Sequence, residues 1–278
     1  MRQVRTGLPL QNHDAVIFCF SGTGNTRWAA QQLAEATGER LVMMTDGNAH
    51  CTLSKNERIG FCFPVHGWQP PRLVRNFIRK LTFSTEQSLD SHYCYALVTC
   101  GDSIGQTMEM LNGELVKKGL RTHSSFSLVM PESYVCLPFM YTDTPQREKE
   151  KIRQASVDLK VYARLITERR KGEHHTKRGV MPWVLSHVIG AYFNSRMISD
   201  RKFTVDAADC IHCGLCAKVC PTGDIRMAGA DPKQQTPEWQ HDGRCTCCLS
   251  CYHHCPRHAI NYGSITRRRG QYYFGHPQ

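Results

Sequence analysis

Eight cysteines near the end of the chain form two runs with the same spacing, C-x2-C-x2-C-x3-C-P. The first run is Cys210, Cys213, Cys216 and Cys220, and the second is Cys245, Cys248, Cys251 and Cys255. Corresponding cysteines lie 35 positions apart, and Ile225 and Ile260 extend the same offset. Thiols at this spacing are typical iron–sulfur ligands, so we expect this region to fold around metal.

Three thiols at positions i, i+3 and i+6 can wrap one [4Fe–4S] cube, but the fourth lies too far along the chain to close it. The pattern resembles that of bacterial two-cluster ferredoxins, in which the fourth cysteine of each run ligates the other cluster. This resemblance implies two ligand sets, namely Cys210, Cys213, Cys216 and Cys255, and Cys245, Cys248, Cys251 and Cys220. We expect Ile225 and Ile260 to wall off the clusters and the region not to fold without iron.

Zinc and disulfides explain the two runs less well. Zinc takes four ligands, often as two C-x2-C pairs, whereas eight cysteines share this double register. The N-terminal sequence MRQVRTGLPL lacks the apolar segment of a signal peptide. Fifteen cysteines without such a signal predict a reducing, cytoplasmic compartment. Cys247 is an extra thiol inside the second run, and the repeat favours Cys245 and Cys248 as the ligands instead of it.

Near the other end of the chain, an apolar run over 15–20 predicts a buried strand, and a helical pattern ends at Gly38. The sequence SGTGNT lies between them and comprises Ser21, Gly22, Thr23, Gly24, Asn25 and Thr26. Backbone N–H groups and hydroxyls in such a loop can hold an anion at the helix N-terminus. The two glycines permit the tight backbone path. The loop is therefore a candidate phosphate site.

Residues 15–33 resemble the flavodoxin phosphate-loop signature, with a departure at Cys19, where an aromatic residue is usual. The loop has no Lys or Arg, which fits a phosphate held by neutral donors, as flavodoxins hold that of FMN. Further strands are predicted over 41–44, 58–63, 93–99 and 124–130, with helices over 71–82 and 105–118. This alternation predicts an α/β fold with a flavodoxin-like, doubly wound parallel five-stranded sheet.

In this fold ligands bind beyond the carboxyl ends of the strands. Two further loops, 64–71 and 100–106, are similar in position to the flavodoxin loops that sandwich the isoalloxazine ring. The resemblance implies FMN contacts at Val65, His66, Gly67, Trp68, Cys100, Gly101, Asp102 and Gly105. Trp68 either stacks on the ring or packs in an ordinary way, and Asp102 either approaches the ring or caps the helix over 105–118. Tyr134 is a weaker candidate contact.

These motifs divide the chain into four parts. We expect a flavodoxin-like FMN-binding domain over 1–140, a helical connector over 141–202, a small α+β two-cluster ferredoxin domain over 203–265, and a basic, aromatic tail over 266–278. The order resembles the EFR1 family of flavodoxin–ferredoxin fusions from anaerobic bacteria. The connector is predicted to form helices over 145–170 and 181–197, which either pack the domains together or act as a hinge.

The formal net charge of +11 would fall to about +5 once two clusters and a flavin phosphate are bound. Residues 141–180 contain eleven Lys or Arg and six Asp or Glu, a local net charge of +5. Because no nucleic-acid-binding motif accompanies this charge, it favours docking of an acidic redox partner, donor or acceptor, over binding to nucleic acid or a membrane. A merely solvated helix face is the default interpretation of 147–171. No apolar stretch is long enough for a membrane span.

The resemblance implies an electron-transfer flavoprotein that passes electrons between FMN and two [4Fe–4S] clusters in anaerobic-type metabolism. Three alternatives stay open: a flavin-dependent reductase that receives electrons through the clusters, a relay subunit of a larger redox complex, and a redox sensor. A reductase acting on a small molecule needs a second pocket over the flavin and a proton donor. His66 and Tyr134 are the candidates for that donor.

Overall fold

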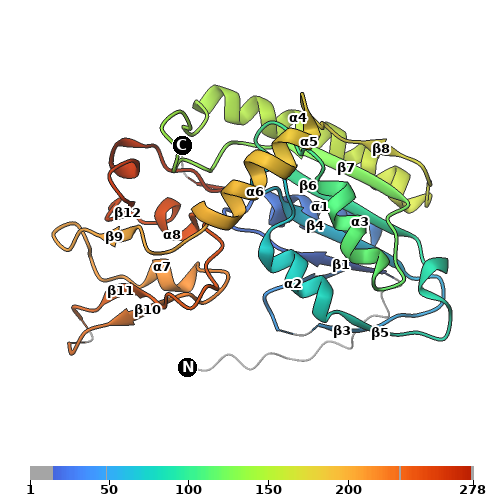
Figure 1. Ribbon diagram of the computed structural model, residues 1–278, viewed down its shortest axis with the longest axis horizontal. Coiled ribbons are helices and arrows are strands. Elements are labelled where there is room, and N and C mark those ends of the chain that lie inside the picture. The colour runs from blue at the N-terminus through green and yellow to red at the C-terminus, as the bar shows by residue number, and fades with distance from the viewer. Residues whose placement is uncertain (1–14, 48, 232, 277–278) are drawn as a thin grey trace.

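The structure is a computed structural model that describes residues 15–47, 49–231 and 233–276 (Figure 1). The segment MRQVRTGLPL, on which the expectation about a signal peptide rests, lies outside the described residues. Within the described ranges, no helix combines the length and the apolar character that crossing a bilayer requires.

A parallel sheet forms the centre of the N-terminal domain. Its main strands are β1 (Ala15–Cys19), β2 (Arg40–Met43), β4 (Arg58–Pro64), β6 (Cys94–Cys100) and β7 (Ser124–Val129). They lie in the order β2-β1-β4-β6-β7, which is the doubly wound order of flavodoxin-like folds. The fold class predicted from the sequence is therefore confirmed. A sixth strand, β8 (His174–His175), extends the sheet beside β7; it was not predicted, because two residues carry no strand pattern.

Helices cover both faces of the sheet (Figure 1). The helices α2 (Arg72–Lys80) and α3 (Thr107–Val116) pack on one face, and α1 (Asn25–Thr37) and α4 (Pro145–Thr167) pack on the other. Successive residues of β1 point to opposite faces, so Phe18 joins the first core and Ile17 the second. A small parallel pair, β3 (His50–Thr52) and β5 (Thr82–Ser84), lies beside the sheet, and a 3-10 turn spans Leu89–Ser91.

The C-terminal domain is built from two antiparallel strand pairs and two short helices. β9 (Phe203–Val205) pairs with β12 (Ile260–Tyr262), and β10 (Ile225–Ala228) pairs with β11 (Thr236–Trp239). The helices are α7 (Leu215–Lys218) and α8 (Ser250–His253), and a 3-10 turn spans Thr266–Arg268.

The sequence repeat is also a repeat of backbone conformation. Three pairs of residues at the same 35-residue offset have positive φ, namely His212 with Cys247, Gly214 with Leu249, and Gly223 with His258. In each half, a backbone N–H four residues beyond the last cysteine of the run donates to that cysteine's sulfur at 3.3 Å. Ile225 and Ile260 are both buried in the core of this domain.

The connector ends in a helical segment made of α5 (Pro182–Val184), a π-helical stretch (Leu185–Ile189), α6 (Gly190–Tyr192) and a second π-helical stretch (Phe193–Met197). Ser186 Oγ donates to the carbonyl of Trp68 at 2.8 Å, and Asn194 Nδ2 donates to the carbonyl of His66 at 3.0 Å. These contacts fix the segment on the loop after β4, which favours packing over a hinge.

The C-terminal tail returns to the N-terminal domain (Figure 1). Tyr272 is buried, and its hydroxyl donates to Asn25 Oδ1 at 2.6 Å. The ring of Phe274 stacks on Trp28 with 5.0 Å between centroids. Arg269, from the basic run, lies over the ring of Tyr141 at 3.6 Å. The tail therefore joins the two domains.

Candidate functional site

Loops at the carboxyl ends of β1, β4, β6 and β7 surround a cavity of about 210 Å³. The predicted contacts that line it are Ser21, Gly22, Thr23, Asn25, Thr26, Val65, His66, Gly67, Trp68, Cys100, Gly101 and Asp102. The other two predicted contacts face neighbouring segments, Gly24 against Phe274, and Gly105 against Trp68 and Ser186. The structure thus brings three loops, far apart in sequence, to one site.

The first loop offers donors for an anion. The hydroxyl of Ser21 is buried, lines the cavity and has no hydrogen-bond partner among the described residues. The loop leads into the N-terminus of α1, whose 13 residues have no acidic side chain in the first turn. Thr26 Oγ1 is bonded to Thr99 Oγ1 at 2.7 Å, and Asn25 Nδ2 donates to the carbonyl of Pro131 at 3.0 Å. These bonds tie the loop to the ends of β6 and β7 and leave the Ser21 hydroxyl available to an anion.

The second loop is a tight turn in which His66 and Gln69 exchange backbone hydrogen bonds of 3.0 and 3.3 Å. Gly67 and Trp68, at its tip, both have positive φ. The Trp68 indole N–H donates to Ser103 Oγ at 3.1 Å and so ties this loop to the third one. Burial lowers the pKa of His66 to about 4, which keeps its imidazole neutral at physiological pH.

Asp102 is not the cap of the following helix, and that alternative is wrong. The helix α3 begins at Thr107 after Gln106, which makes no side-chain cap. Asp102 instead accepts a hydrogen bond from Lys177 Nζ at 2.9 Å, and this bond lowers the pKa of its carboxyl group.

Glu132 is a residue of the site that sequence reasoning missed. It follows β7, lines the cavity, and accepts hydrogen bonds from the backbone N–H groups of Ser133 and Tyr134 at 3.0 and 2.9 Å. Its second carboxylate oxygen lies against Gly101, in space that a side chain there would fill. Burial raises the pKa of Glu132. Tyr134, the weaker candidate, also lines the cavity.

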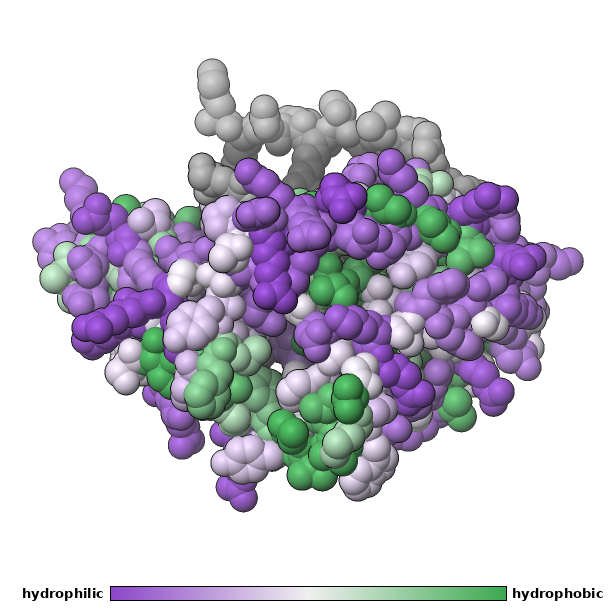
Figure 2. Space-filling view, turned by 90° about the horizontal axis from the view of Figure 1, so that it is seen from above, coloured by the Kyte–Doolittle hydropathy of each residue, from purple (hydrophilic) through white to green (hydrophobic). Residues whose placement is uncertain are grey.

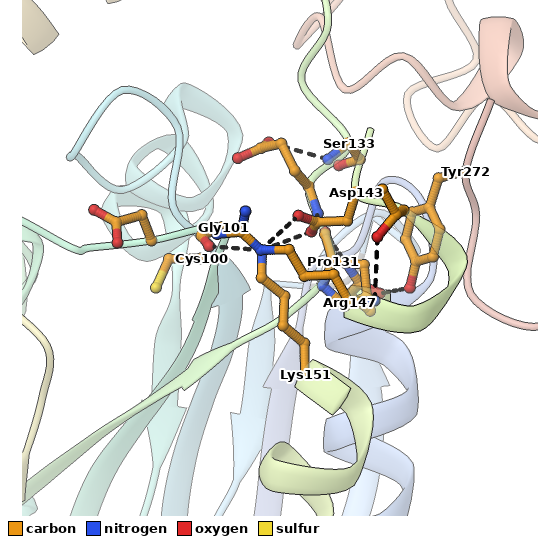
Figure 3. A network of polar contacts seen from close by, with 12 residues as sticks. Cys100, Gly101, Pro131, Ser133, Asp143, Arg147, Lys151 and Tyr272 are labelled. Carbon is orange, nitrogen blue, oxygen red and sulfur yellow. Dashed lines mark hydrogen bonds and ion pairs between the residues drawn. The ribbon is translucent and has the colours of Figure 1, made fainter. Parts of the chain in front are cut away.

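A lysine from α4 supports the third loop, which is the loop after β6 (Figure 3). Lys151 Nζ donates to the carbonyl of Gly101 at 3.1 Å and to Asp143 Oδ2 at 2.6 Å. Asp143 Oδ2 also accepts the backbone N–H of Glu132 at 2.9 Å. One cation therefore links the loops after β6 and β7. No local pattern in the sequence signals this link, because Lys151 is one of many charged residues along the helix.

The cysteines of each predicted cluster set lie near one another. Cys210, Cys213, Cys216 and Cys255 line one small cavity. In the other set, burial raises the pKa of Cys251 well above its ordinary value, and the nearby thiols of Cys248, Cys245 and Cys220 raise it further. Within the part of the chain that the structure describes, no three His, Cys, Asp or Glu side chains converge as ligands of a single ion do.

The second cysteine run lies against the loop cavity. Thr246, Cys247 and Cys248 line the same cavity as Ser21 and Gly22. Cys247 is buried, and its Sγ lies 3.1 Å from the carbonyl oxygen of Ser199. By the repeat it corresponds to His212, between two ligand positions, so it stays a predicted non-ligand.

The other cysteines lie in the N-terminal domain and its neighbouring loops. Cys19, Cys62 and Cys94 are buried in strands, and Cys51, Cys100 and Cys136 are buried as well. Burial raises the pKa of Cys19, Cys100 and Cys136 to about 12, so these thiols are poor nucleophiles.

Residues 209–259 match a family described as a 4Fe-4S dicluster domain. No curated protein matches the chain. Among solved structures, the chain is similar to the two-electron reduced flavodoxin of Megasphaera elsdenii, with 17% identity and a TM-score of 0.32 over 52% of this chain and 98% of that one.

Two further solved structures are similar at comparable levels. A putative flavoprotein from Bacteroides eggerthii DSM 20697 shows 18% identity and a TM-score of 0.30, over 52% of this chain and 98% of that one. An FMN-dependent NADH-azoreductase from Bacillus anthracis str. Ames Ancestor, in complex with FMN, shows 8% identity and a TM-score of 0.36, over 55% and 98%. The strand order itself carries the fold assignment: a flavodoxin-like α/β domain precedes a ferredoxin-type iron–sulfur domain.

Proposed function

We propose that the chain is an electron-transfer flavoprotein that holds one FMN in the loop cavity and two [4Fe–4S] clusters on its cysteine sets. The observation that carries this proposal is that the loop cavity and the second cysteine set share a lining residue. Cys248, a predicted cluster ligand, lines the cavity beside Ser21 and Gly22 of the phosphate loop. An FMN and a cluster held on either side of Cys248 would be well placed to exchange electrons.

The residues of the cavity fit FMN. The unpartnered Ser21 hydroxyl and the N-terminus of α1 suit its phosphate, and the cavity continues from there to Trp68 and Gly101. When bound, FMN links two-electron to one-electron chemistry, and the clusters carry single electrons. The chain's own part is to hold the phosphate with neutral donors and to fix the ring loops through Trp68, Ser103 and Lys151.

The cysteine sets fit [4Fe–4S] clusters. A cube holds its four sulfur ligands apart around a body of iron and sulfide, so thiols that line a small cavity suit it better than thiols converging on a point. Backbone N–H groups of Asp224 and Ala259 donate to the sulfurs of Cys220 and Cys255, which stabilises thiolates and tunes a cluster's potential. We retain the crossed ligand sets as part of the proposal.

The order of the two domains supports membership of the EFR1 family of flavodoxin–ferredoxin fusions. We further propose a reducing compartment such as the cytoplasm, because none of the fifteen cysteines is joined in a disulfide. The basic excess of the chain supports an acidic redox protein as donor or acceptor.

A second candidate is a flavin-dependent reductase acting on a small molecule. Glu132 favours it, because this half-buried carboxyl group faces the cavity and burial raises its pKa toward that of a general acid. His66 stays neutral and can donate a hydrogen bond there. Steady-state assays with small acceptors, with electrons supplied by reduced ferredoxin, separate the two candidates, because a carrier alone turns over none of the acceptors selectively.

Anaerobic purification followed by iron, sulfide and flavin assays tests the main proposal. We expect about eight irons and about one FMN per chain. Fewer than about six irons, or no flavin, would contradict the proposal.

A further inference from the structure

The connector helix over 182–197 turns small and polar residues inward together with Phe193, and turns several apolar residues outward. Ser186, Gly190 and Asn194, each four residues apart, are buried against the loops of the flavodoxin-like domain. The opposite side carries Val188 and Tyr192, which are 54% and 64% exposed. An amphipathic helix on a domain in water has the reverse arrangement. Covering the outward side of the helix would remove its apolar side chains from water and is therefore favourable.

The exposed apolar side chains of this surface, which we call the connector face, are Val180, Met181, Trp183, Val188, Ile189 and Tyr192. Trp183, Val188, Ile189 and Tyr192 lie in the helical segment, and Val180 and Met181 directly precede it. Figure 2 shows apolar side chains gathered at the lower edge of that view. The face combines aliphatic side chains with one indole and one phenol, which is the composition of protein segments that sit at a membrane interface.

The charges around the connector face are mostly positive. Residues 174–199 include no Asp or Glu, and residues 169–202 include eight Lys or Arg against two acidic residues. Lys177 and Arg178 are paired with Asp102 and Glu109. Arg196, on the exposed side of the helix, and Arg201 with Lys202 just beyond it add positive charge at the other end. The rim of the face therefore attracts a negatively charged surface.

We propose that the connector face docks on an anionic membrane surface, with the helix lying in the plane of the headgroups. Trp183 and Tyr192 enter the interface, and Arg196 meets lipid phosphates. The shape of the face favours lipid over a folded partner. A stable protein interface takes about 20–30 residues a side, whereas the connector face offers only six exposed apolar residues, four of them on the helix, which suits a deformable bilayer. This proposal does not depend on a bound flavin.

Sedimentation with vesicles tests the proposal on the full chain loaded with its cofactors. We expect binding to vesicles of phosphatidylcholine with phosphatidylglycerol, weaker binding to phosphatidylcholine alone, and a decrease as salt is raised. The variant Val188→Ser/Tyr192→Ser should lower the partition coefficient about tenfold or more. The matched control is Val157→Ser/Val161→Ser, an exposed apolar pair at the same spacing on α4, which should bind as the wild type does.

Fluorescence locates the contact. Addition of anionic vesicles should shift tryptophan emission to the blue, and Trp183→Phe should remove that shift. Unchanged visible cluster absorbance in each variant shows that the fold is intact. The proposal is overturned if the wild type does not bind anionic vesicles at low salt, or if both double variants bind equally. It is also overturned if the connector face supports only self-association or only binding to an acidic protein, and not to vesicles.

Discussion

Gly22 lies directly against Cys248: a methyl group added at Gly22 would stand 2.6 Å from the Cβ of Cys248 and 3.4 Å from its sulfur. Gly22 belongs to the proposed phosphate loop, and Cys248 belongs to the second cysteine set. The flavodoxin-like and ferredoxin-type domains thus meet where the backbone of the proposed phosphate loop contacts the side chain of a proposed cluster ligand. Glycine is required at position 22 because Cys248 approaches it so closely, and not because of the backbone angles at that position.

The substitution Gly22→Ala should therefore push the two domains apart. Overpacking of this kind costs about 1–3 kcal/mol, and we expect FMN binding to weaken about tenfold, as measured by fluorescence titration of flavin-depleted protein. Gly113→Ala is the control, because nothing lies within 4 Å of a methyl group added there in α3. It should leave FMN binding unchanged and raise stability by up to about 1 kcal/mol. Wild-type FMN affinity in Gly22→Ala would refute the contact.

The tail should support the phosphate loop through Tyr272. Its hydroxyl donates to Asn25 Oδ1, and its backbone N–H donates to Nδ1 of His253 at 3.0 Å. Tyr272→Phe leaves the Asn25 oxygen buried without this donor, at a cost of about 1–3 kcal/mol. We expect a lower thermal midpoint and reduced flavin content. Tyr273→Phe keeps the ring that stacks on His254 and should behave as the wild type does; equal losses in both variants would contradict this role.

The sequence was sufficient for features that depend on local pattern. The strand, loop and helix around SGTGNT appear as expected, and the 35-residue repeat in the sequence is accompanied by matched backbone angles at His212 and Cys247. The α/β alternation predicts the strand order, because parallel crossovers leave few topologies open.

Other features depend on contacts between distant residues and have no local signal. Tyr272 and Asn25 are 247 positions apart, and Lys151 reaches Gly101 from a helix that reads as solvated. Glu132 looked like an ordinary loop residue, because its burial arises only when the loops after β6 and β7 close on the cavity. The two-residue strand β8 likewise forms because it pairs with β7, where Phe126 lies opposite His175, and its own sequence gives no strand signal.

Glu132 should give the protein a dependence on pH. Burial raises its pKa in the folded chain above the unfolded value of about 4.3, so the folded state holds the proton more tightly. Its contribution to stability is fully present below about pH 4.3 and is lost as pH rises through the raised pKa. Glu132→Gln does not titrate. The thermal midpoint of this variant, relative to the wild type, should therefore increase from pH 5 to pH 8.

Asp102→Asn provides the control for that measurement. Lys177 lowers the pKa of Asp102, so its contribution to stability is lost only as pH falls through that lowered value. The difference between Asp102→Asn and the wild type should therefore stay constant from pH 5 to pH 8. If Glu132→Gln shows the same constant difference, Glu132 does not carry a raised pKa.

The last cysteine of each run distinguishes crossed from local ligation. Cys255 lines the cavity formed by the first run, and the thiol of Cys220 lies near Cys248 and Cys251 of the second. With crossed ligands, Cys220→Ser should damage the proposed cluster beside the loop cavity, whereas Cys255→Ser should damage the other one. Each variant should keep about four of the eight irons.

Electron paramagnetic resonance of the reduced protein tells the two losses apart, because a cluster near the flavin couples magnetically to its radical. That coupling should disappear in Cys220→Ser and persist in Cys255→Ser; the reverse pattern would establish local ligation. Cys247→Ser is the matched control inside the second run. Because the Sγ of Cys247 lies against the carbonyl of Ser199 and its position repeats that of His212, this variant should keep all its iron and the coupling.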